Sequence, residues 1–119
     1  MPYVDGFVIP IPADKIDVYR KIAAKAGKVW MEYGALQYVE CVGDDMDIEK
    51  MVPFPKLAKA KAGETVVFSW ITYKNKAHRD KVNAAVMKDP RLNEMMEGTK
   101  MPFNMKRMAY GGFKTVVDL

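Results

Sequence analysis

The pattern of apolar and polar positions predicts four strands. Runs of β-branched and aromatic residues are typical of strands. We expect the first to end at Pro10 and Pro12, because proline lacks the N–H group that a strand ladder uses. Gly111 and Gly112 are expected to break the last one. The four predicted strands cover residues 3–9, 35–42, 65–73 and 106–117.

Two segments between these runs have the spacing of amphipathic helices. In the first, Ile16, Tyr19, Ala23, Ala26, Trp30 and Tyr33 recur every three or four residues. Asp14 is the expected N-cap of this helix, and Gly34 its end. A second helix is predicted over residues 75–88, capped by Asn75 and stopped by Pro90. We expect the methionine-rich segment that follows to be irregular.

The resulting order, β-α-β-β-α-β, predicts an α+β, ferredoxin-like fold with a four-stranded antiparallel sheet. Right-handed crossovers place both helices on one face of that sheet. We expect one domain over residues 1–119, with a long loop insertion at about 44–63.

Both faces of the predicted sheet are apolar. On the third strand, Val66, Phe68 and Trp70 lie on one face, and Val67 and Ile71 on the other. Helices cover only one face, and an exposed apolar sheet would be unusual for a soluble monomer. We therefore expect a homodimer through the open sheet faces, a dimeric α/β barrel. In this arrangement the Gly111-Gly112 step lets the chain end reach across to the partner.

Composition narrows the class of protein. The formal net charge is +4 with both signs mixed along the chain, which a solvated surface explains without a nucleic-acid partner. We expect no membrane segment, no leader peptide and therefore a cytoplasmic location. Cys41 is the one cysteine, so we expect no disulfide, no metal site and no cofactor, and Cys41 is expected to be buried. Of ten methionines, a late group is expected to fill the core or an interface: Met95, Met96, Met101, Met105 and Met108.

Several motifs along the chain resemble those of the YbaA-like family, bacterial proteins with a domain of unknown function. They are Tyr3-Val4-Asp5-Gly6-Phe7, Val67-Phe68-Ser69-Trp70-Ile71, His78-Arg79-Asp80, and the ending from Met101-Pro102-Phe103 through Lys106-Arg107-Met108 to Tyr110-Gly111-Gly112-Phe113. The resemblance spans essentially the whole chain. It implies a dimeric ferredoxin-like α/β barrel and transfers no catalytic residues, because no activity is established for the family.

The first functional hypothesis is a binder of a small, partly apolar molecule, in a pocket between sheet and helices. Asp5 is the main polar candidate, because a carboxylate within an apolar strand needs a partner. We expect that partner to be Lys106 or Arg107 on the neighbouring strand. The candidate pocket residues are Asp5, Trp70, Tyr73, His78, Arg107 and Tyr110.

Two alternatives belong to other classes. A monooxygenase-like or isomerase-like enzyme would use His78 as base and Trp70 to shape the pocket, with residues 44–63 as a lid and haem as a sub-case. It requires both side chains to line one cavity. RNA binding is suggested by the element order of RNA-recognition motifs. However, the third strand lacks the basic residue and glycine of their motif, which argues against it.

Overall fold

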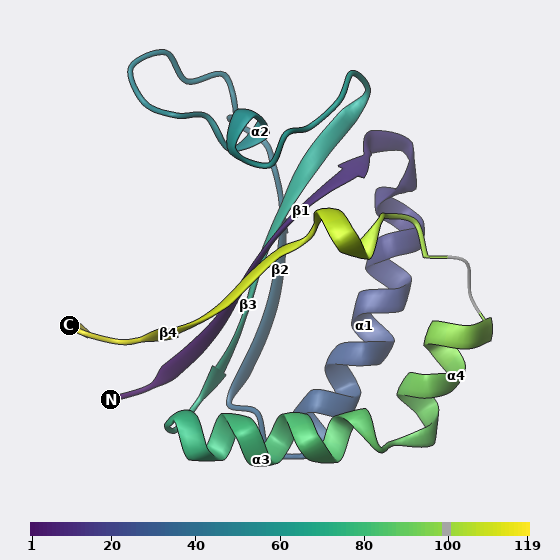
Figure 1. Ribbon diagram of the computed structural model, residues 1–119, viewed down its shortest axis with the longest axis vertical. Helices are drawn as coiled ribbons and strands as arrows, with labels where there is room; N and C mark the ends of the chain where they lie inside the picture. The colour runs from purple at the N-terminus through teal and green to yellow at the C-terminus, as the bar shows by residue number, and fades with distance from the viewer. Residues whose placement is uncertain (99–100) are drawn as a thin grey trace.

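The computed structural model describes residues 1–98 and 101–119 (Figure 1). Two short 3₁₀ turns, Ala13–Lys15 and Met105–Arg107, join longer elements. These elements are β1 (Tyr3–Pro12), α1 (Ile16–Glu32), β2 (Gln37–Val42), α2 (Phe54–Leu57), β3 (Glu64–Tyr73), α3 (Lys76–Met87), α4 (Pro90–Gly98) and β4 (Ala109–Lys114).

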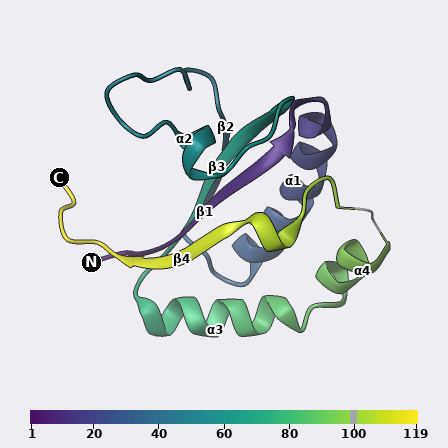
Figure 2. The same ribbon diagram turned by 45° about the horizontal axis from the view of Figure 1, so that its top comes forward.

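The four strands form one antiparallel sheet in the order β2-β3-β1-β4. This is the ferredoxin-like arrangement, so the predicted fold class is confirmed. In the register of the sheet, Asp5 of β1 lies opposite Ile71 of β3 and Gly112 of β4. The two chain ends lie close together at one end of the sheet (Figure 2).

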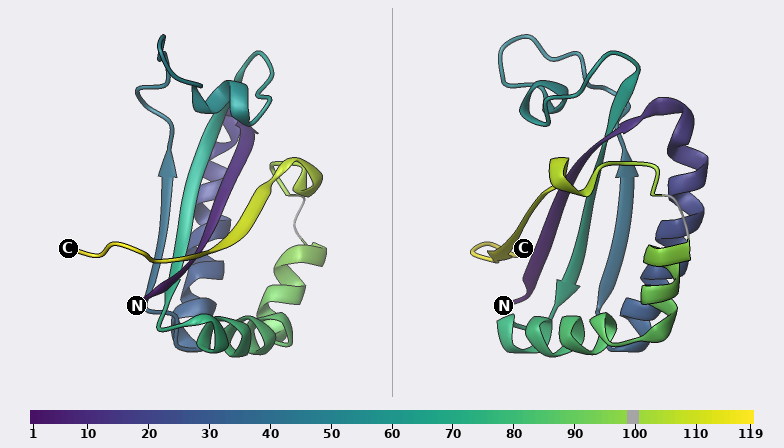
Figure 3. Two further views of the ribbon diagram at one scale, coloured as in Figure 1. Left: turned by 60° about the vertical axis from the view of Figure 1, so that its left-hand side comes forward. Right: turned by 45° about the vertical axis from the view of Figure 1, so that its right-hand side comes forward.

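Three helices cover one face of the sheet. The helix α1 runs along the strands, whereas α3 lies across one end of them and α4 turns back beside α1 (Figure 3). Buried side chains from all three pack with β3 in one cluster, which includes Val29, Ile71, Tyr73, Val82 and Leu92. Because α3 lies crosswise, the helices do not fill the whole width of the helical face.

The strands at the chain ends differ from the prediction. The strand β1 continues through Pro10 to Pro12. Its pairing with β4 ends at Val8, so the prolines lie where β1 has one neighbour, and proline is tolerated at such an edge. The strand β4 is shorter than predicted and is not broken by its glycines. Gly112 instead makes room for Tyr3, whose ring and hydroxyl a Cβ at this position would meet.

The helix boundaries also needed correction. Asp14 is not an N-cap, since α1 begins after Lys15 without a side-chain cap, but Gly34 ends the helix with a φ of +112°. Asn75 caps α3 as predicted. The irregular segment expected after Pro90 begins with α4. Pro90 occupies the first position of that helix, and the Asp89 carboxylate accepts a hydrogen bond from the Arg91 N–H at 2.8 Å.

The sheet face turned away from α1, α3 and α4, here called the open face, carries exposed aromatic side chains. Phe68 is 45% exposed and Phe113 60%. The ring centroids of Phe68 and Trp70 are 5.7 Å apart. Cys41 of β2 lies opposite Phe68 and is exposed on the same face. The expectation of a buried thiol was therefore wrong. Within residues 1–98 and 101–119, no helix has the length and apolar character that crossing a membrane requires.

Gly27 sets the distance between α1 and β2. A Cβ at this position would lie 2.7 Å from Cδ1 and Cε1 of the Tyr38 ring, well inside van der Waals contact. Gly27→Ala should therefore lower the free energy of unfolding by about 1–2 kcal/mol, because overpacking outweighs the helix propensity of alanine. Urea unfolding followed by circular dichroism measures this.

The control is Ala24→Gly at an exposed position of the same helix. It should cost about 0.5–1 kcal/mol, which reports helix propensity alone. If Gly27→Ala instead stabilises the protein by a similar amount, the close approach to Tyr38 does not limit the packing of α1.

Candidate functional site

A cavity of about 530 Å³ lies between the helical face of the sheet and the helices. This volume is within the range of small-molecule sites. The strands β1, β2 and β3 form its floor, and α1, α3, α4 and the segment before β4 form its walls. Its aromatic lining consists of Phe7, Tyr19, Trp30, Tyr38, Phe103 and Tyr110.

The methionines predicted to fill the core or an interface also line this cavity, and Met95 and Met108 pack against the core as predicted. Met95 and Met96 come from α4, and three more come from the segment that leads to β4. Methionine has a flexible, polarizable side chain that adapts to different ligand shapes. The cavity therefore has one adaptable wall opposite a rigid sheet.

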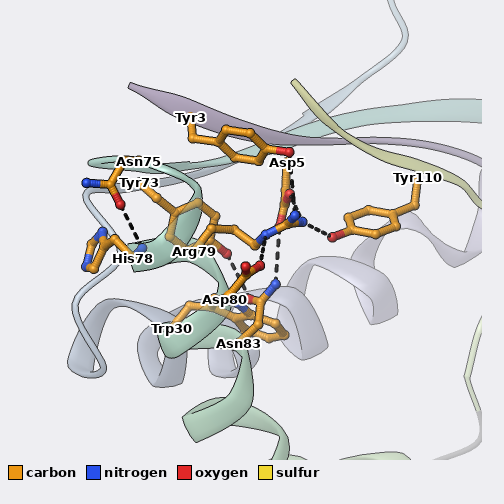
Figure 4. Close-up of polar contacts among 10 residues, drawn as sticks. All are labelled: Tyr3, Asp5, Trp30, Tyr73, Asn75, His78, Arg79, Asp80, Asn83 and Tyr110. Atoms are coloured by element: carbon orange, nitrogen blue, oxygen red, sulfur yellow. Dashed lines mark hydrogen bonds and ion pairs between the residues drawn. The ribbon is translucent and has the colours of Figure 1, made fainter. Parts of the chain in front are cut away.

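Asp5 and Arg79 form an ion pair at the end of the cavity near α3. Asp5 is 1% exposed, and its Oδ1 lies 2.8 Å from Nη1 of Arg79. The same Nη1 donates to the Tyr110 hydroxyl at 2.8 Å, and the guanidinium lies 5.0 Å from the centre of the Tyr3 ring (Figure 4). This contact joins β1, α3 and β4.

Asn83 extends the network to α1. Its Oδ1 accepts hydrogen bonds from the Trp30 indole N–H and the Tyr73 hydroxyl, both at 3.0 Å. Its Nδ2 donates to the second oxygen of Asp5 at 3.3 Å. Every polar atom of this side chain thus has a partner, as burial requires.

The network fixes the protonation states of Arg79 and Tyr73. Burial, the largest single influence, would lower the pKa of Arg79, but the charge of Asp5 together with Tyr110, Tyr3 and Asp80 raises it overall. Burial raises the pKa of Tyr73 above its usual range, and so does the charge of Asp5. At neutral pH the guanidinium is charged and the phenol is neutral, so both act as donors.

Glu40 on β2 is a second polar point of the cavity. Its two carboxylate oxygens accept hydrogen bonds from Tyr19 at 2.7 Å and Tyr38 at 2.9 Å. Burial, and next the charge of Glu40, raise the pKa of both tyrosines well above the usual range. Both phenols therefore stay protonated and donate to the carboxylate.

The predicted pocket residues do not all lie in one site. Asp5 and Tyr110 line the cavity, and Tyr73 joins them through Asn83. His78 lies at the start of α3, where its Nδ1 accepts from the Lys74 N–H at 3.0 Å and its ring meets Tyr73 edge-on. In Figure 4 the imidazole points away from Asp5. His78 does not line the cavity.

The Trp70 side chain lies on the open face. It shares that face with Phe68, and its indole N–H donates to Gln37 at 3.0 Å. Trp70 borders the cavity, but because side chains alternate along a strand, its side chain points to the opposite face of the sheet. His78 and Trp70 therefore do not form one site, and the hypothesis of an enzyme that uses both is wrong on this geometry.

Arg107 does not reach Asp5 and does not line the cavity. It binds Glu64 through two hydrogen bonds of 2.8 Å and the Lys59 carbonyl at 3.0 Å. The hydrogen bonds from Arg107 lower the pKa of Glu64 to about 2. The expected pairing of Asp5 with Lys106 or Arg107 was wrong, because Arg107 holds the start of β3 instead.

Residues 44–63 do not act as a lid over this cavity. None of them lines it, and α2 contacts the open face through Phe54, whose ring centroid lies 5.9 Å from that of Phe68. Among residues 1–98 and 101–119, no group of three or more His, Cys, Asp or Glu side chains is placed to hold a metal ion. What the arrangement can do is bind an apolar molecule and orient it by a few polar groups.

The partners of the buried acid were missed from the sequence. Arg79 and Asn83 are four residues apart, so they share a helix face. Val82 and Val86, which are buried, mark that face as the inner one. An arginine on the inner face of this helix was the signal that could have predicted the ion pair between Arg79 and Asp5.

Comparisons with known proteins support the fold and the family. The model of the family described as "Protein of unknown function (DUF1428)" matches residues 2–105. The "Uncharacterized protein YbaA" of Escherichia coli (strain K12) is 50% identical over 118 residues, which cover 99% of each chain. The resemblance inferred from the motifs is thereby confirmed.

Two solved structures have the same fold at low sequence identity. A dimeric ferredoxin-like protein from an uncultured marine organism has a TM-score of 0.53, 15% identity and complete coverage of both chains. A NIPSNAP domain protein from Burkholderia xenovorans has a TM-score of 0.51 and 13% identity, covering 96% of this chain and 94% of that one.

The Asp5–Arg79 pair should be essential for stability. Arg79→Met leaves a buried carboxylate without its cation and should lower the free energy of unfolding by about 3–5 kcal/mol. In the double variant Asp5→Asn/Arg79→Met the buried charge is gone, so the combined loss should be smaller than the sum of the two single losses. Urea unfolding at one fixed protein concentration measures all four proteins.

The control is Arg20→Met, which removes a pair with Asp17 whose side chains are 71% and 87% exposed. It should change stability by less than about 1 kcal/mol. Strict additivity of Asp5→Asn and Arg79→Met would show that the two residues are not coupled.

Proposed function

This protein belongs to the DUF1428 family, and we propose that it is a homodimeric, non-catalytic binding protein for a small, largely apolar molecule. The observation that carries this proposal is the cavity of about 530 Å³ between sheet and helices. Well-packed cores do not leave openings of this size, since their voids seldom exceed a water molecule.

The lining of the cavity supports a ligand with an apolar body. Its walls are aromatic rings, methionine side chains and small residues of α1 such as Ala23 and Ala26. The polar groups are few and lie at separate points, among them Asp5, Glu40 and Asn83. Such a lining gives binding energy through apolar burial and orientation through a few hydrogen bonds.

The dimer is supported by the open face. The exposed rings of Phe68 and Phe113 are costly in water, and an apolar sheet face of this kind marks an interaction site. A second copy of the same face provides an apolar surface of matching size. One of the two solved structures of similar fold is described as dimeric.

The two tryptophans allow cavity and open face to be observed separately. Trp30 lines the cavity, so the variant Trp70→Phe keeps one fluorophore at the proposed site. Titration of this variant with 4-cyclohexylbutanol, a neutral apolar probe, should change the emission of Trp30 in a saturable way. The same titration of Trp30→Phe, in which Trp70 remains, should give no saturable change.

A cavity-filling variant tests the location of the probe. Ala26→Phe, made in the Trp70→Phe protein, occupies cavity volume and should weaken probe binding by about tenfold or more, a loss of ~1.4 kcal/mol. Ala84→Phe on the exposed side of α3 adds the same side chain away from the cavity and should leave affinity unchanged. Equal affinity in both variants, with native circular dichroism, would place the probe elsewhere.

The dimer is tested by light scattering at micromolar concentration. The protein should have twice the chain mass of 13.5 kDa. Phe68→Asp buries a charge in the proposed interface, so it should shift the protein to monomer.

Val18→Asp is the matched control, since Val18 on α1 has the same 45% exposure as Phe68 but lies outside the sheet. This variant should remain dimeric. A wild-type protein that is monomeric throughout the concentration range would disprove the dimer without affecting the cavity.

A further inference from the structure

Among the described residues, the ionisable side chains that line the cavity are, apart from tyrosines, all acidic. Its ionisable side chains, apart from tyrosines, are Asp5 and Glu40, and no Lys, Arg or His of residues 1–98 and 101–119 lines it. This contrasts with the whole chain, whose formal net charge is +4. A basic protein thus surrounds this cavity with aromatic, apolar and acidic groups.

The two acids are not equivalent. Asp5 is neutralised by Arg79, which lies 2.8 Å away behind the lining. Glu40 forms no ion pair within the described part of the chain. Its carboxylate accepts hydrogen bonds from the hydroxyl groups of Tyr19 and Tyr38, and Arg20 lines a smaller neighbouring pocket that Glu40 also borders.

The carboxylate of Glu40 still has room for a ligand. Each of its oxygens accepts one phenolic hydrogen bond, and a carboxylate oxygen has about two acceptor positions. The two tyrosines stay protonated at neutral pH, so they hold the carboxylate in place. Glu40 is half-buried at the cavity wall and can accept N–H donors from inside it.

The surrounding rings also favour positive charge. Tyr19 and Tyr38 contact Glu40, and Trp30, which also lines the cavity, has its ring centroid 6.1 Å from that of Tyr38. Aromatic faces attract cations through their quadrupole, and this attraction is larger where water is excluded. An anionic ligand would meet two carboxylates and no cation within the described lining.

We propose that the ligand of this cavity is an organic cation, a protonated amine on an apolar body, whose ammonium group binds Glu40 beside Tyr19 and Tyr38. The inference rests on the proposed function and adds the ligand class to it. The apolar body then lies against the methionines of α4 and the sheet. The ammonium donates to the carboxylate and contacts the aromatic rings.

Three probes with one apolar body separate charge from shape: 4-cyclohexylbutylamine, 4-cyclohexylbutanol and 4-cyclohexylbutanoate. At pH 7 the amine is protonated, since alkylamines titrate near the value of lysine, about 10.4. Isothermal titration calorimetry with the wild-type protein should give an affinity for the amine at least about tenfold above that for the alcohol. The carboxylate should bind more weakly than the alcohol.

Glu40→Gln keeps the size of the side chain and removes its charge. It should reduce the preference for amine over alcohol to less than about threefold, while the alcohol binds as before. Asp17→Asn removes an equal charge at an exposed position of α1 and should leave the preference unchanged. Should Glu40→Gln not fold, NMR of the wild type replaces it. Contacts between the amine-bearing methylene and the rings of Tyr19 and Tyr38 are then expected.

The outcomes are distinguishable. The proposal of a cationic ligand is overturned if amine and alcohol bind equally well. It is also overturned if the amine-bearing methylene contacts the methionine methyl groups instead of the two tyrosines. Either result leaves the cavity as an apolar binding site. Absence of binding by all three probes overturns the binding function itself. An amine preference lost in Glu40→Gln and retained in Asp17→Asn establishes the inference.

Discussion

The buried contact between Asp5 and Arg79 is the interaction on which the rest of the structure depends. A carboxylate that is 1% exposed requires a cation, and the cation is on α3, far along the chain. Meeting this requirement brings the start of α3 to the start of β1, beside Tyr110 of β4. Asn83, one turn later, then reaches Trp30 of α1. One ion pair thus determines how strands and helices meet.

The cavity is a consequence of this arrangement. With its first turn held at the start of β1, α3 crosses the strands instead of lying along them (Figures 1 and 3). The space over the middle of the sheet is then bordered by α1, α4 and methionine side chains. Arg79 lies behind Asp5, outside the lining, so the structural ion pair contributes no positive charge to the cavity surface. Of the two acids in the lining, Glu40 is the one that forms no ion pair within the described residues.

Local patterns predicted the order of the elements. The apolar runs of the strands, the stripe of α1, Asn75 as N-cap and Gly34 as helix end are features of neighbouring residues. Asn75 and Gly34 lie where predicted, whereas β1 extends further than predicted and β4 is shorter. Pro90 was interpreted as a stop although it also begins α4, because a proline that ends one helix is equally suited to the first turn of the next. The glycines of β4 and the prolines of β1 were misjudged because their effect depends on the neighbouring strand.

The amino-acid sequence by itself determined the fold class, the family and the need of Asp5 for a cation. Which cation meets that need was decided by tertiary structure, since Arg107, in the turn before the neighbouring strand β4, binds Glu64, while Arg79 comes from α3. Tertiary structure also decided that Trp70 faces away from His78 and that Tyr19 and Tyr38 converge on Glu40. The physical reason is the same in each case: strand alternation and helix periodicity assign a side chain to a face. Only the packing of distant segments determines what that face meets.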